Sequence, residues 1–122
     1  MHRMRKTTLV VDDDPLYLDL VRDVLAVQEI EVLSALSVAE ALTLLKTASP
    51  TFIVSDFEMP DMDGLAFHEH LQQHQKTKDI PFVFMTGSSD TRLLEYVRQH
   101  NISMFSKNNL VKELIRLSND LK

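Results

Sequence analysis

Hydrophobic positions along the chain form a repeated pattern, in which a short apolar run is followed by a longer amphipathic segment, five times over. The apolar runs cover residues 7–11, 30–36, 52–55, 81–85 and 102–105. Such alternation is typical of βα units that build a parallel sheet. The stretches Leu9–Val11 and Phe82–Met85 are apolar at every position, which indicates strands covered by helices on both faces. The pattern therefore predicts an α/β fold, an open three-layer α/β/α sandwich.

Cap residues and helical spacing predict where the helices lie. Asp14 followed by Pro15 is a favourable helix start, because Asp caps the first turn and Pro fits inside it. Ser37 and Glu40 form a capping box ahead of a second helix, which we expect to continue to about Ala48. The apolar residues at helical spacing in the first, third, fourth and last helices are Leu16, Leu18, Leu20, Val21, Val24 and Leu25; Leu65, Phe67 and Leu71; Leu93, Leu94 and Val97; and Leu110, Leu114, Ile115 and Leu117.

Composition narrows the class of protein. The 122 residues are 44% hydrophobic and fit one globular domain, and the absence of cysteine excludes disulfides and thiolate metal sites. Net charge is −5, and three of the 13 basic residues lie in the first six positions, which argues against a nucleic-acid-binding surface on the rest. We interpret residues 1–6 as a basic N-terminal tail and residues 7–122 as the domain. No run approaches the ~20 apolar residues of a membrane span, so we expect a cytoplasmic protein.

Residues whose side chains can bind ions or take part in a reaction lie where the predicted strands end. Asp12 and Asp13 follow the first run, Asp56 the third, Thr86 the fourth and Lys107 the fifth. Open parallel sheets place their sites just beyond the carboxyl ends of the strands, so we expect these five residues at one edge. Three neighbouring carboxylates repel one another unless a cation intervenes, and a hard ion such as Mg²⁺ suits oxygen ligands. A lysine and a hydroxyl beside them suit a phosphoryl group better than a carbonyl.

Three segments of the chain resemble the response-regulator receiver family of two-component signal transduction. They run from Val10 to Pro15, from Ile53 to Gly64 and from Phe82 to Gly87. The middle segment, with its Asp, Met-Pro and Met-Asp-Gly in order, is the most specific, and the resemblance covers roughly residues 7–121. It implies a (βα)5 flavodoxin-like fold with a five-stranded parallel sheet of order 2-1-3-4-5.

The resemblance also implies the roles of the acidic residues. Asp56 would be the phosphoacceptor, taking a phosphoryl group from a histidine kinase or a histidine phosphotransfer protein. Asp13 would bind Mg²⁺ or Mn²⁺ directly and Asp12 mainly through water, with Asp56 and the backbone carbonyl of Glu58 as further ligands. Such a domain is not an enzyme in the ordinary sense, because it catalyses only its own phosphorylation and dephosphorylation.

The remaining roles implied by the resemblance concern the switch and the partners. Thr86 would hydrogen-bond one phosphoryl oxygen and Lys107 would neutralise another. Movement of Thr86 would then control a downstream effector or an attached output domain. The resemblance allows a homodimer through the fourth helix, the fifth strand and the fifth helix, and gives no reason to expect direct binding of nucleic acid or membrane. Whether the chain acts alone or belongs to a larger regulator or hybrid kinase stays open.

The chain departs from the family pattern at four places. Asn108 stands where the family usually has a proline after a cis peptide. A cis bond without proline costs ~2.5–4 kcal/mol, so the loop could instead be trans with Lys107 displaced, and the sequence leaves the isomer open. Met104 stands where the switch aromatic is usual, three residues before the lysine. Phe105 should face the opposite side of the sheet. The other two departures are Glu58, an acid beside the expected metal, and Gly87, the residue after Thr86.

Two other functions fit parts of the sequence. A degenerate receiver, which binds a partner without being phosphorylated, would accommodate Asn108 and Met104. A Mg²⁺-dependent phosphohydrolase of the haloacid-dehalogenase type would explain Asp12-x-Asp14, but Pro15 stands where that class has Thr or Val.

Three histidines on the third helix are weaker candidates for a metal site. His70 and His74 have metal-capable i, i+4 spacing, and His68 begins like a zincin motif. Gln72 stands where that motif needs its second histidine. We therefore interpret all three histidines as part of an exposed helix face.

Overall fold

The computed structural model describes residues 6–87, 91–109, 112–113 and 116. The strands are β1 (Thr7–Val11), β2 (Glu31–Ala35), β3 (Phe52–Asp56), β4 (Phe82–Thr86) and β5 (Ser103–Ser106). The helices are α1 (Pro15–Val27), α2 (Val38–Leu45), α3 (Gly64–Gln72) and α4 (Thr91–His100), followed by a 3-10 turn, η1 (Lys107–Asn109). Of the predicted last helix only residues 112–113 and 116 are described, and these are helical; the rest of it, and residues 1–5 of the predicted tail, lie outside the described residues.

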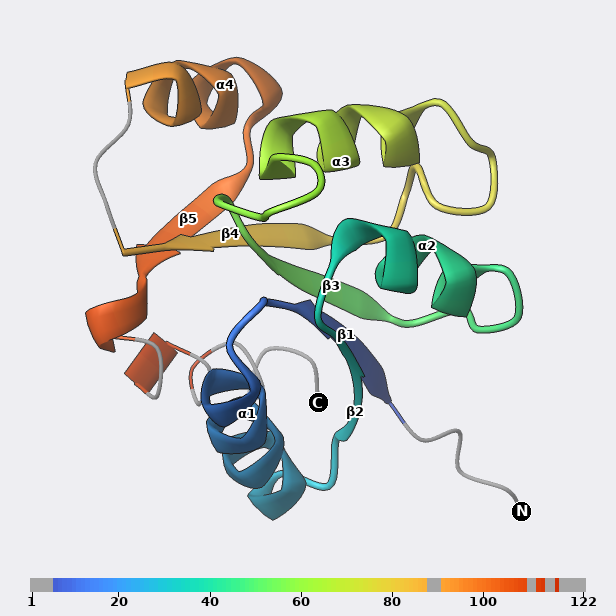
Figure 1. The fold of residues 1–122 in the computed structure, drawn as a ribbon, viewed down its shortest axis with the longest axis vertical. Helices are drawn as coiled ribbons and strands as arrows, with labels where there is room; N and C mark the ends of the chain where they lie inside the picture. Colours follow the sequence, from blue (N-terminus) through green and yellow to red (C-terminus); the bar gives the residue numbers. More distant parts are fainter. Residues whose placement is uncertain (1–5, 88–90, 110–111, 114–115, 117–122) are drawn as a thin grey trace.

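The strands form one parallel sheet of order β2-β1-β3-β4-β5, which confirms the predicted topology. Helix α1 covers one face, and α2, α3 and α4 cover the other (Figure 1). Alternate residues of the central strands supply the two sides of the core, because neighbouring side chains of a strand point to opposite faces. Val10 and Val54 pack with α1, whereas Leu9 and Ile53 pack with α2 and α3.

The caps behave as predicted, but the end of α2 and the buried face of α1 differ from the prediction. Asp14 Oδ1 accepts a hydrogen bond from the Leu16 amide (3.0 Å). Helix α2 ends at Leu45 rather than near Ala48. The buried stripe of α1 consists of Leu18, Val21 and Leu25, whereas two leucines that were assigned to the apolar pattern are exposed, Leu16 and Leu20.

The interpretation of His68 as an exposed residue is wrong. His68 is 4% exposed, and its Nδ1 lies 2.7 Å from Tyr96 Oη on α4. Its ring also packs edge-on against Phe82, with the centroids 4.9 Å apart. Helix α3 lies between α2 and α4, so more of its surface is covered than a single apolar stripe would suggest (Figure 1). His74 is exposed as predicted, and His70 is half-buried.

Strand β5 confirms the prediction that Met104 and Phe105, the two residues at its centre, face opposite sides of the sheet. It pairs with β4 without a break in register, from Ser103 to Ser106. Met104 packs on the side of the sheet that holds Phe84 and α4, whereas Phe105 packs on the α1 side. The aromatic ring of β5 therefore faces away from α4.

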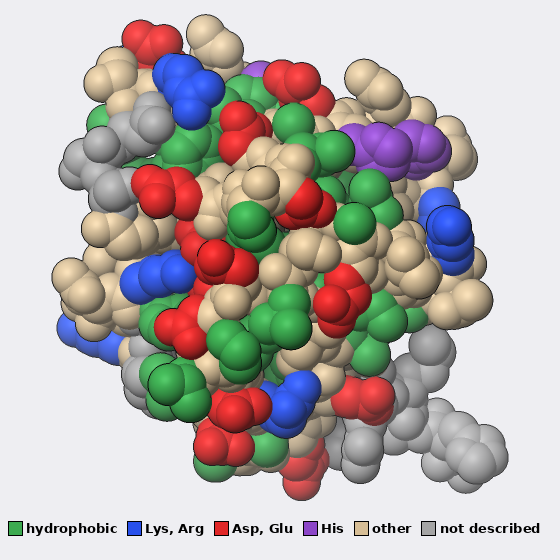
Figure 2. Space-filling model, viewed as in Figure 1, with side chains coloured by type: hydrophobic (Ala, Val, Ile, Leu, Met, Phe, Trp, Pro, Cys, Tyr) green, Lys and Arg blue, Asp and Glu red, His purple; other side chains and the backbone are tan. Residues whose placement is uncertain are grey.

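The face shown in Figure 2 carries more acidic than basic side chains, in keeping with the net charge of −5. Within the described part of the chain, no helix combines the length and apolar character that crossing a bilayer requires.

Candidate functional site

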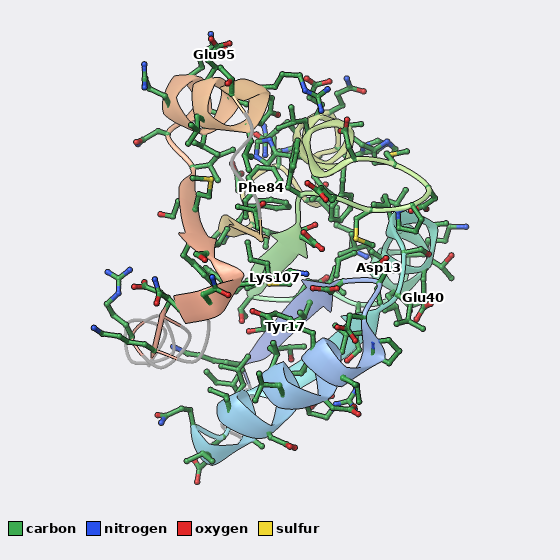
Figure 3. All side chains as sticks on the ribbon, turned by 60° about the vertical axis from the view of Figure 1, so that its left-hand side comes forward. Asp13, Tyr17, Glu40, Phe84, Glu95 and Lys107 are labelled. Carbon is green, nitrogen blue, oxygen red and sulfur yellow. The ribbon has the colours of Figure 1, made fainter. Side chains whose placement is uncertain are left out.

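The acidic residues at the ends of β1 and β3 come together as predicted. Carboxylate oxygens of Asp12, Asp13 and Asp56 all lie within 4.8 Å of one another. Lys107, which follows β5 directly, places Nζ 2.7 Å from Asp12 Oδ2 and 2.8 Å from Asp56 Oδ2. Figure 3 shows Lys107 and Asp13 beside the same end of the sheet. Four of the five predicted residues are thus in one cluster.

Local turns aim the two buried carboxylates. Asp12 Oδ1 accepts a hydrogen bond from the Asp14 amide (2.9 Å), and Asp56 Oδ1 accepts one from the Glu58 amide (3.2 Å). Each is an aspartate bonded to the backbone two residues on, a common way to build a tight turn. The second oxygen of each carboxylate is left to face Lys107. Asp12 and Asp56 are buried, whereas Asp13 is exposed.

Burial and charge act in opposite directions on the titration of this cluster. Burial raises the pKa of Asp56, and the hydrogen bond and charge of Lys107 offset only part of that rise. Burial lowers the pKa of Lys107, but its bonds to Asp12 and Asp56 outweigh that effect, so the net shift is upward. Lys107 therefore stays an ammonium at neutral pH.

The donor set suits a hard divalent cation. Three carboxylates lie together and two of them contact the ammonium of Lys107, so negative charge is in excess. Mg²⁺ and Mn²⁺ prefer oxygen ligands such as carboxylates. Mg²⁺ commonly uses one or two carboxylates and keeps several waters. Asp12, Asp13 and Asp56 fit such an ion.

The trans backbone after β5 does not keep Lys107 from the cluster. The described residues contain no cis peptide bond, so the bond before Asn108, whose isomer the sequence leaves open, is trans. Ser106 Oγ accepts a hydrogen bond from the Asn108 amide (3.1 Å), which shapes the turn that carries Lys107. The lysine still reaches both buried carboxylates directly.

Thr86 ends β4, the strand next to Asp56. The register pairs Asp56 with Met85 and Thr86 with Ser106, so two hydroxyl residues follow β3 along this edge. Thr86 is 6% exposed. This position agrees with the prediction that Thr86 lies at the active edge, while its contact with a phosphoryl group stays a prediction.

Asp56 opens into a hollow of about 680 Å³. The residues that line this hollow come from the turns after β1, β3 and β5 and from the start of α4: Asp13, Asp14, Asp56, Phe57, Glu58, Met59, Pro60, Asp63, Arg92 and Lys107. The hollow connects a carboxylate that is itself buried with the surface of the domain.

Two aspartates in the turn between β3 and α3 cap the neighbouring helices α2 and α3. Asp61 accepts hydrogen bonds from the Val38 and Ala39 amides (3.2 and 2.9 Å), and so caps α2 from a distance in sequence. These bonds, chiefly that from Ala39, lower the pKa of Asp61. Asp63 caps α3 by accepting from the Ala66 amide (2.9 Å). These hydrogen bonds hold the turn after Asp56, which lines part of the hollow, against α2 and α3.

Sequence reasoning missed Tyr17 as part of the site. Its Oη donates a hydrogen bond to the Lys107 carbonyl (2.7 Å), and its ring lies beneath the Lys107 ammonium. A signal was present, because Tyr17 lies four residues before the buried Val21 and so falls on the inward face of α1. Arg92 was missed as well, and its guanidinium lies over the Phe57 ring at 5.7 Å from the centroid.

The family model described as the response regulator receiver domain matches residues 8–117. The chain belongs to this family. The receiver domain is 28% identical over 96 residues to the polar-differentiation response regulator DivK of Brucella abortus, which covers 79% of the chain and 78% of that protein. It is also 38% identical over 79 residues to an uncharacterized 14.6 kDa protein of Leptolyngbya boryana, covering 65% of the chain and 60% of that protein.

Solved structures agree with the fold. A putative response regulator from Chloroflexus aurantiacus superposes on the receiver domain with a TM-score of 0.84 at 27% identity, covering 95% of this chain and 97% of the other. The chemotaxis response regulator CheY4 of Vibrio cholerae gives a TM-score of 0.77 at 24% identity, covering 93% and 98%. At that identity the second likeness shows the fold alone.

Proposed function

We propose that Asp56 accepts a phosphoryl group from a histidine kinase or a histidine phosphotransfer protein, and that this modification switches the domain. The observation that carries the proposal is the position of the Asp56 carboxylate, which lies between two further aspartates and the Lys107 ammonium and opens into a hollow. Membership of the receiver family supports the same reading.

The transfer follows from the charges around Asp56. A carboxylate oxygen of Asp56 attacks the phosphorus of the phosphohistidine, the phosphorus–nitrogen bond breaks, and its electron pair returns to the imidazole. Lys107 offsets charge on the phosphoryl oxygens, and Thr86 donates its hydroxyl hydrogen to one of them. A Mg²⁺ or Mn²⁺ ion held by Asp12, Asp13, Asp56 and the Glu58 carbonyl would supply further charge neutralisation. Hydrolysis of the acyl phosphate by water completes the only reactions that we assign to this domain.

Phosphorylation then alters the edge that carries β4 and β5. An aspartyl phosphate brings negative charge and strong acceptor oxygens to a buried position, and Thr86 lies on the adjacent strand. Because Met104 packs beside Phe84 and Phe105 faces α1, the signal would pass through a flexible methionine rather than through a ring on the α4 side.

The partners follow from this role. We assign to the domain a cytosolic kinase or phosphotransfer protein as donor and an effector protein, or an attached output domain, as target. We assign no direct contact with nucleic acid or membrane. A homodimer through α4 and β5 fits the proposal, although the fifth helix that would complete its surface lies outside the described residues.

Labelling with acetyl phosphate in the presence of Mg²⁺ tests the proposal. The wild-type protein should gain one phosphoryl group, Asp56→Asn should gain none, and Asp13→Asn should need a higher Mg²⁺ concentration for half-maximal labelling. Asp79→Asn, at an exposed position outside the cluster, is the matched control and should behave like the wild type.

The alternative is a degenerate receiver that binds its partner without being phosphorylated, as the departures at Met104 and Asn108 suggest. Beryllofluoride with Mg²⁺ mimics the phosphorylated aspartate, and amide resonances of β4 and α4 should shift when it binds. If no resonance changes in the wild type, the switch is excluded and the degenerate receiver is favoured.

A further inference from the structure

Tyr17 makes two separate contacts with Lys107, at opposite ends of that residue. Its Oη donates a hydrogen bond to the Lys107 backbone carbonyl at 2.7 Å. The Lys107 Nζ lies 4.8 Å from the centroid of the Tyr17 ring, a distance at which the ring face attracts a cation. The two residues are 90 positions apart in sequence, and Figure 3 shows them side by side below the end of the sheet.

The position of the Lys107 ammonium depends on support from outside its own loop. Lysine has a flexible four-carbon side chain and makes no fixed fork of donors as arginine does. Strand pairing ends at Ser106, and Lys107 begins the 3-10 turn. Without further contacts, both the backbone and the side chain of Lys107 could rotate away from Asp56.

Tyr17 supplies that support from α1, which packs on the core and is therefore fixed. The ring of Tyr17 is half-buried against the cluster that contains Val10, Val54 and Met85. Its hydroxyl fixes the backbone of Lys107, and its ring faces the ammonium that contacts Asp12 and Asp56. A tyrosine that served only to fill the core would not need its hydroxyl aimed at this carbonyl.

We propose that Tyr17 is a positioning residue for phosphoryl transfer, which holds Lys107 so that its ammonium faces the phosphoryl group on Asp56. The inference rests on the proposed function of Asp56. Tyr17 does not touch the reacting atoms, and it acts only through Lys107. Its hydroxyl and its ring contribute separately, because one fixes the backbone and the other the ammonium.

Two substitutions separate these contributions. Tyr17→Phe removes the hydroxyl and keeps the ring, whereas Tyr17→Leu removes both. At saturating Mg²⁺ we expect acetyl phosphate to label Tyr17→Phe about 3-fold more slowly than the wild type, and Tyr17→Leu about 10-fold more slowly. Tyr96→Phe removes the hydroxyl of the other tyrosine, on α4, and should label at the wild-type rate.

A double-mutant comparison distinguishes positioning from a general structural role. In a Lys107→Met background, adding Tyr17→Phe or Tyr17→Leu should cause no further loss of labelling rate, since the residue through which Tyr17 acts is gone. A loss of the same size as in the wild-type background would overturn the inference.

A second measurement needs no phosphorylation. In protein carrying ¹³C-labelled lysine, the ε-methylene protons of Lys107 should resonate upfield, because they lie over an aromatic ring. This shift should persist in Tyr17→Phe and in Tyr96→Phe and disappear in Tyr17→Leu. If Tyr17→Leu leaves the Lys107 resonance in place, the contact is absent and the inference fails.

The two readouts separate this inference from the proposed function. If the wild type shows the upfield lysine signal but is never labelled on Asp56, the proposed phosphoacceptor role fails, and the positioning role fails with it. If the wild type is labelled and both Tyr17 variants are labelled at its rate, only the role of Tyr17 is overturned.

Discussion

At the scale of single residues, the turn after Asp56 leaves no room at Gly64. A Cβ atom at this position would lie 2.7 Å from Phe84 Cε1 and 3.0 Å from both the Asp56 carbonyl oxygen and Phe57 Cα. Two of these neighbours are backbone atoms and the third belongs to a ring that is fully buried. The glycine of the Met-Asp-Gly motif is therefore required by close packing against Phe84 and the backbone of Asp56 and Phe57.

Gly64→Ala should destabilise the domain by about 1–3 kcal/mol, the usual cost of overpacking a core. Gly87→Ala is the matched control, because a Cβ there would meet nothing within 4 Å and the backbone of neither glycine has positive φ. Its free energy of unfolding should stay within about 0.5 kcal/mol of the wild type. Urea denaturation of the three proteins measures both effects, and equal stability of the two variants would contradict the packing argument.

At the scale of secondary-structure elements, α4 is joined to α3 through a buried histidine and its aromatic neighbours. Burial, together with the positive charge of the nearby His100, lowers the pKa of His68 from 6.5 to about 4. Tyr96 lies between the two, with Oη bonded to His68 and its ring stacked on His100 at 4.0 Å. Burial, followed by the charge of Glu69, raises the pKa of Tyr96 to about 12, so the phenol stays neutral.

The histidine makes the packing of α4 sensitive to acid. Between pH 4 and 6.5 the unfolded chain binds a proton at His68 that the folded chain rejects, so stability rises with pH across this window and levels off above it. We expect wild-type protein to lose about 1–2 kcal/mol more than His68→Phe between pH 7.5 and pH 5. Urea denaturation at the two values measures the difference. An equal loss in both proteins would show that His68 does not carry the effect.

The elements also show where sequence reasoning succeeds. The βα rhythm and the charged strand ends predict the sheet and the cluster of Asp12, Asp56 and Lys107, because both follow from local patterns and from the geometry of parallel sheets. The end of α2 could not be predicted in this way. Its last carbonyls, those of Leu45 and Lys46, accept hydrogen bonds from Lys76 Nζ at 2.7 and 3.4 Å.

His68 and Tyr17 were misjudged or missed for a related reason. Each depends on a partner far away in sequence, Tyr96 in one case and Lys107 in the other. Periodicity shows which face of a helix is apolar, but it does not show which second helix or loop will cover a polar residue on that face. Contacts of this kind become visible only once the layers are assembled.

At the scale of the whole molecule, Lys107 connects three strands at one edge of the sheet. It extends from the end of β5 and contacts Asp12 after β1 and Asp56 at the end of β3. The side chain of Lys107 is 22% exposed, whereas those of Asp12 and Asp56 are 0% and 7% exposed. The molecule as a whole is acidic, so this ammonium and a bound cation act on the same excess of negative charge.

Lys107→Met should therefore change both the stability of the domain and its response to metal. Without divalent ions, the variant should be less stable than the wild type by about 2 kcal/mol or more, since two buried carboxylates lose the ammonium that contacts them both. Added Mg²⁺ binds the folded state and stabilises it by about 1.4 kcal/mol for each tenfold excess over Kd. In the variant the carboxylates no longer share their charge with Lys107, so they should bind Mg²⁺ more tightly and the difference in stability should narrow.

Thermal unfolding in EDTA and in a series of MgCl₂ concentrations measures both effects. Lys78→Met removes an exposed lysine away from the site and should leave the metal response unchanged. If Mg²⁺ stabilises the wild type more than Lys107→Met, the lysine assists metal binding instead of competing with it. That outcome would contradict the electrostatic argument, in which removal of one cation from clustered carboxylates strengthens their attraction for another.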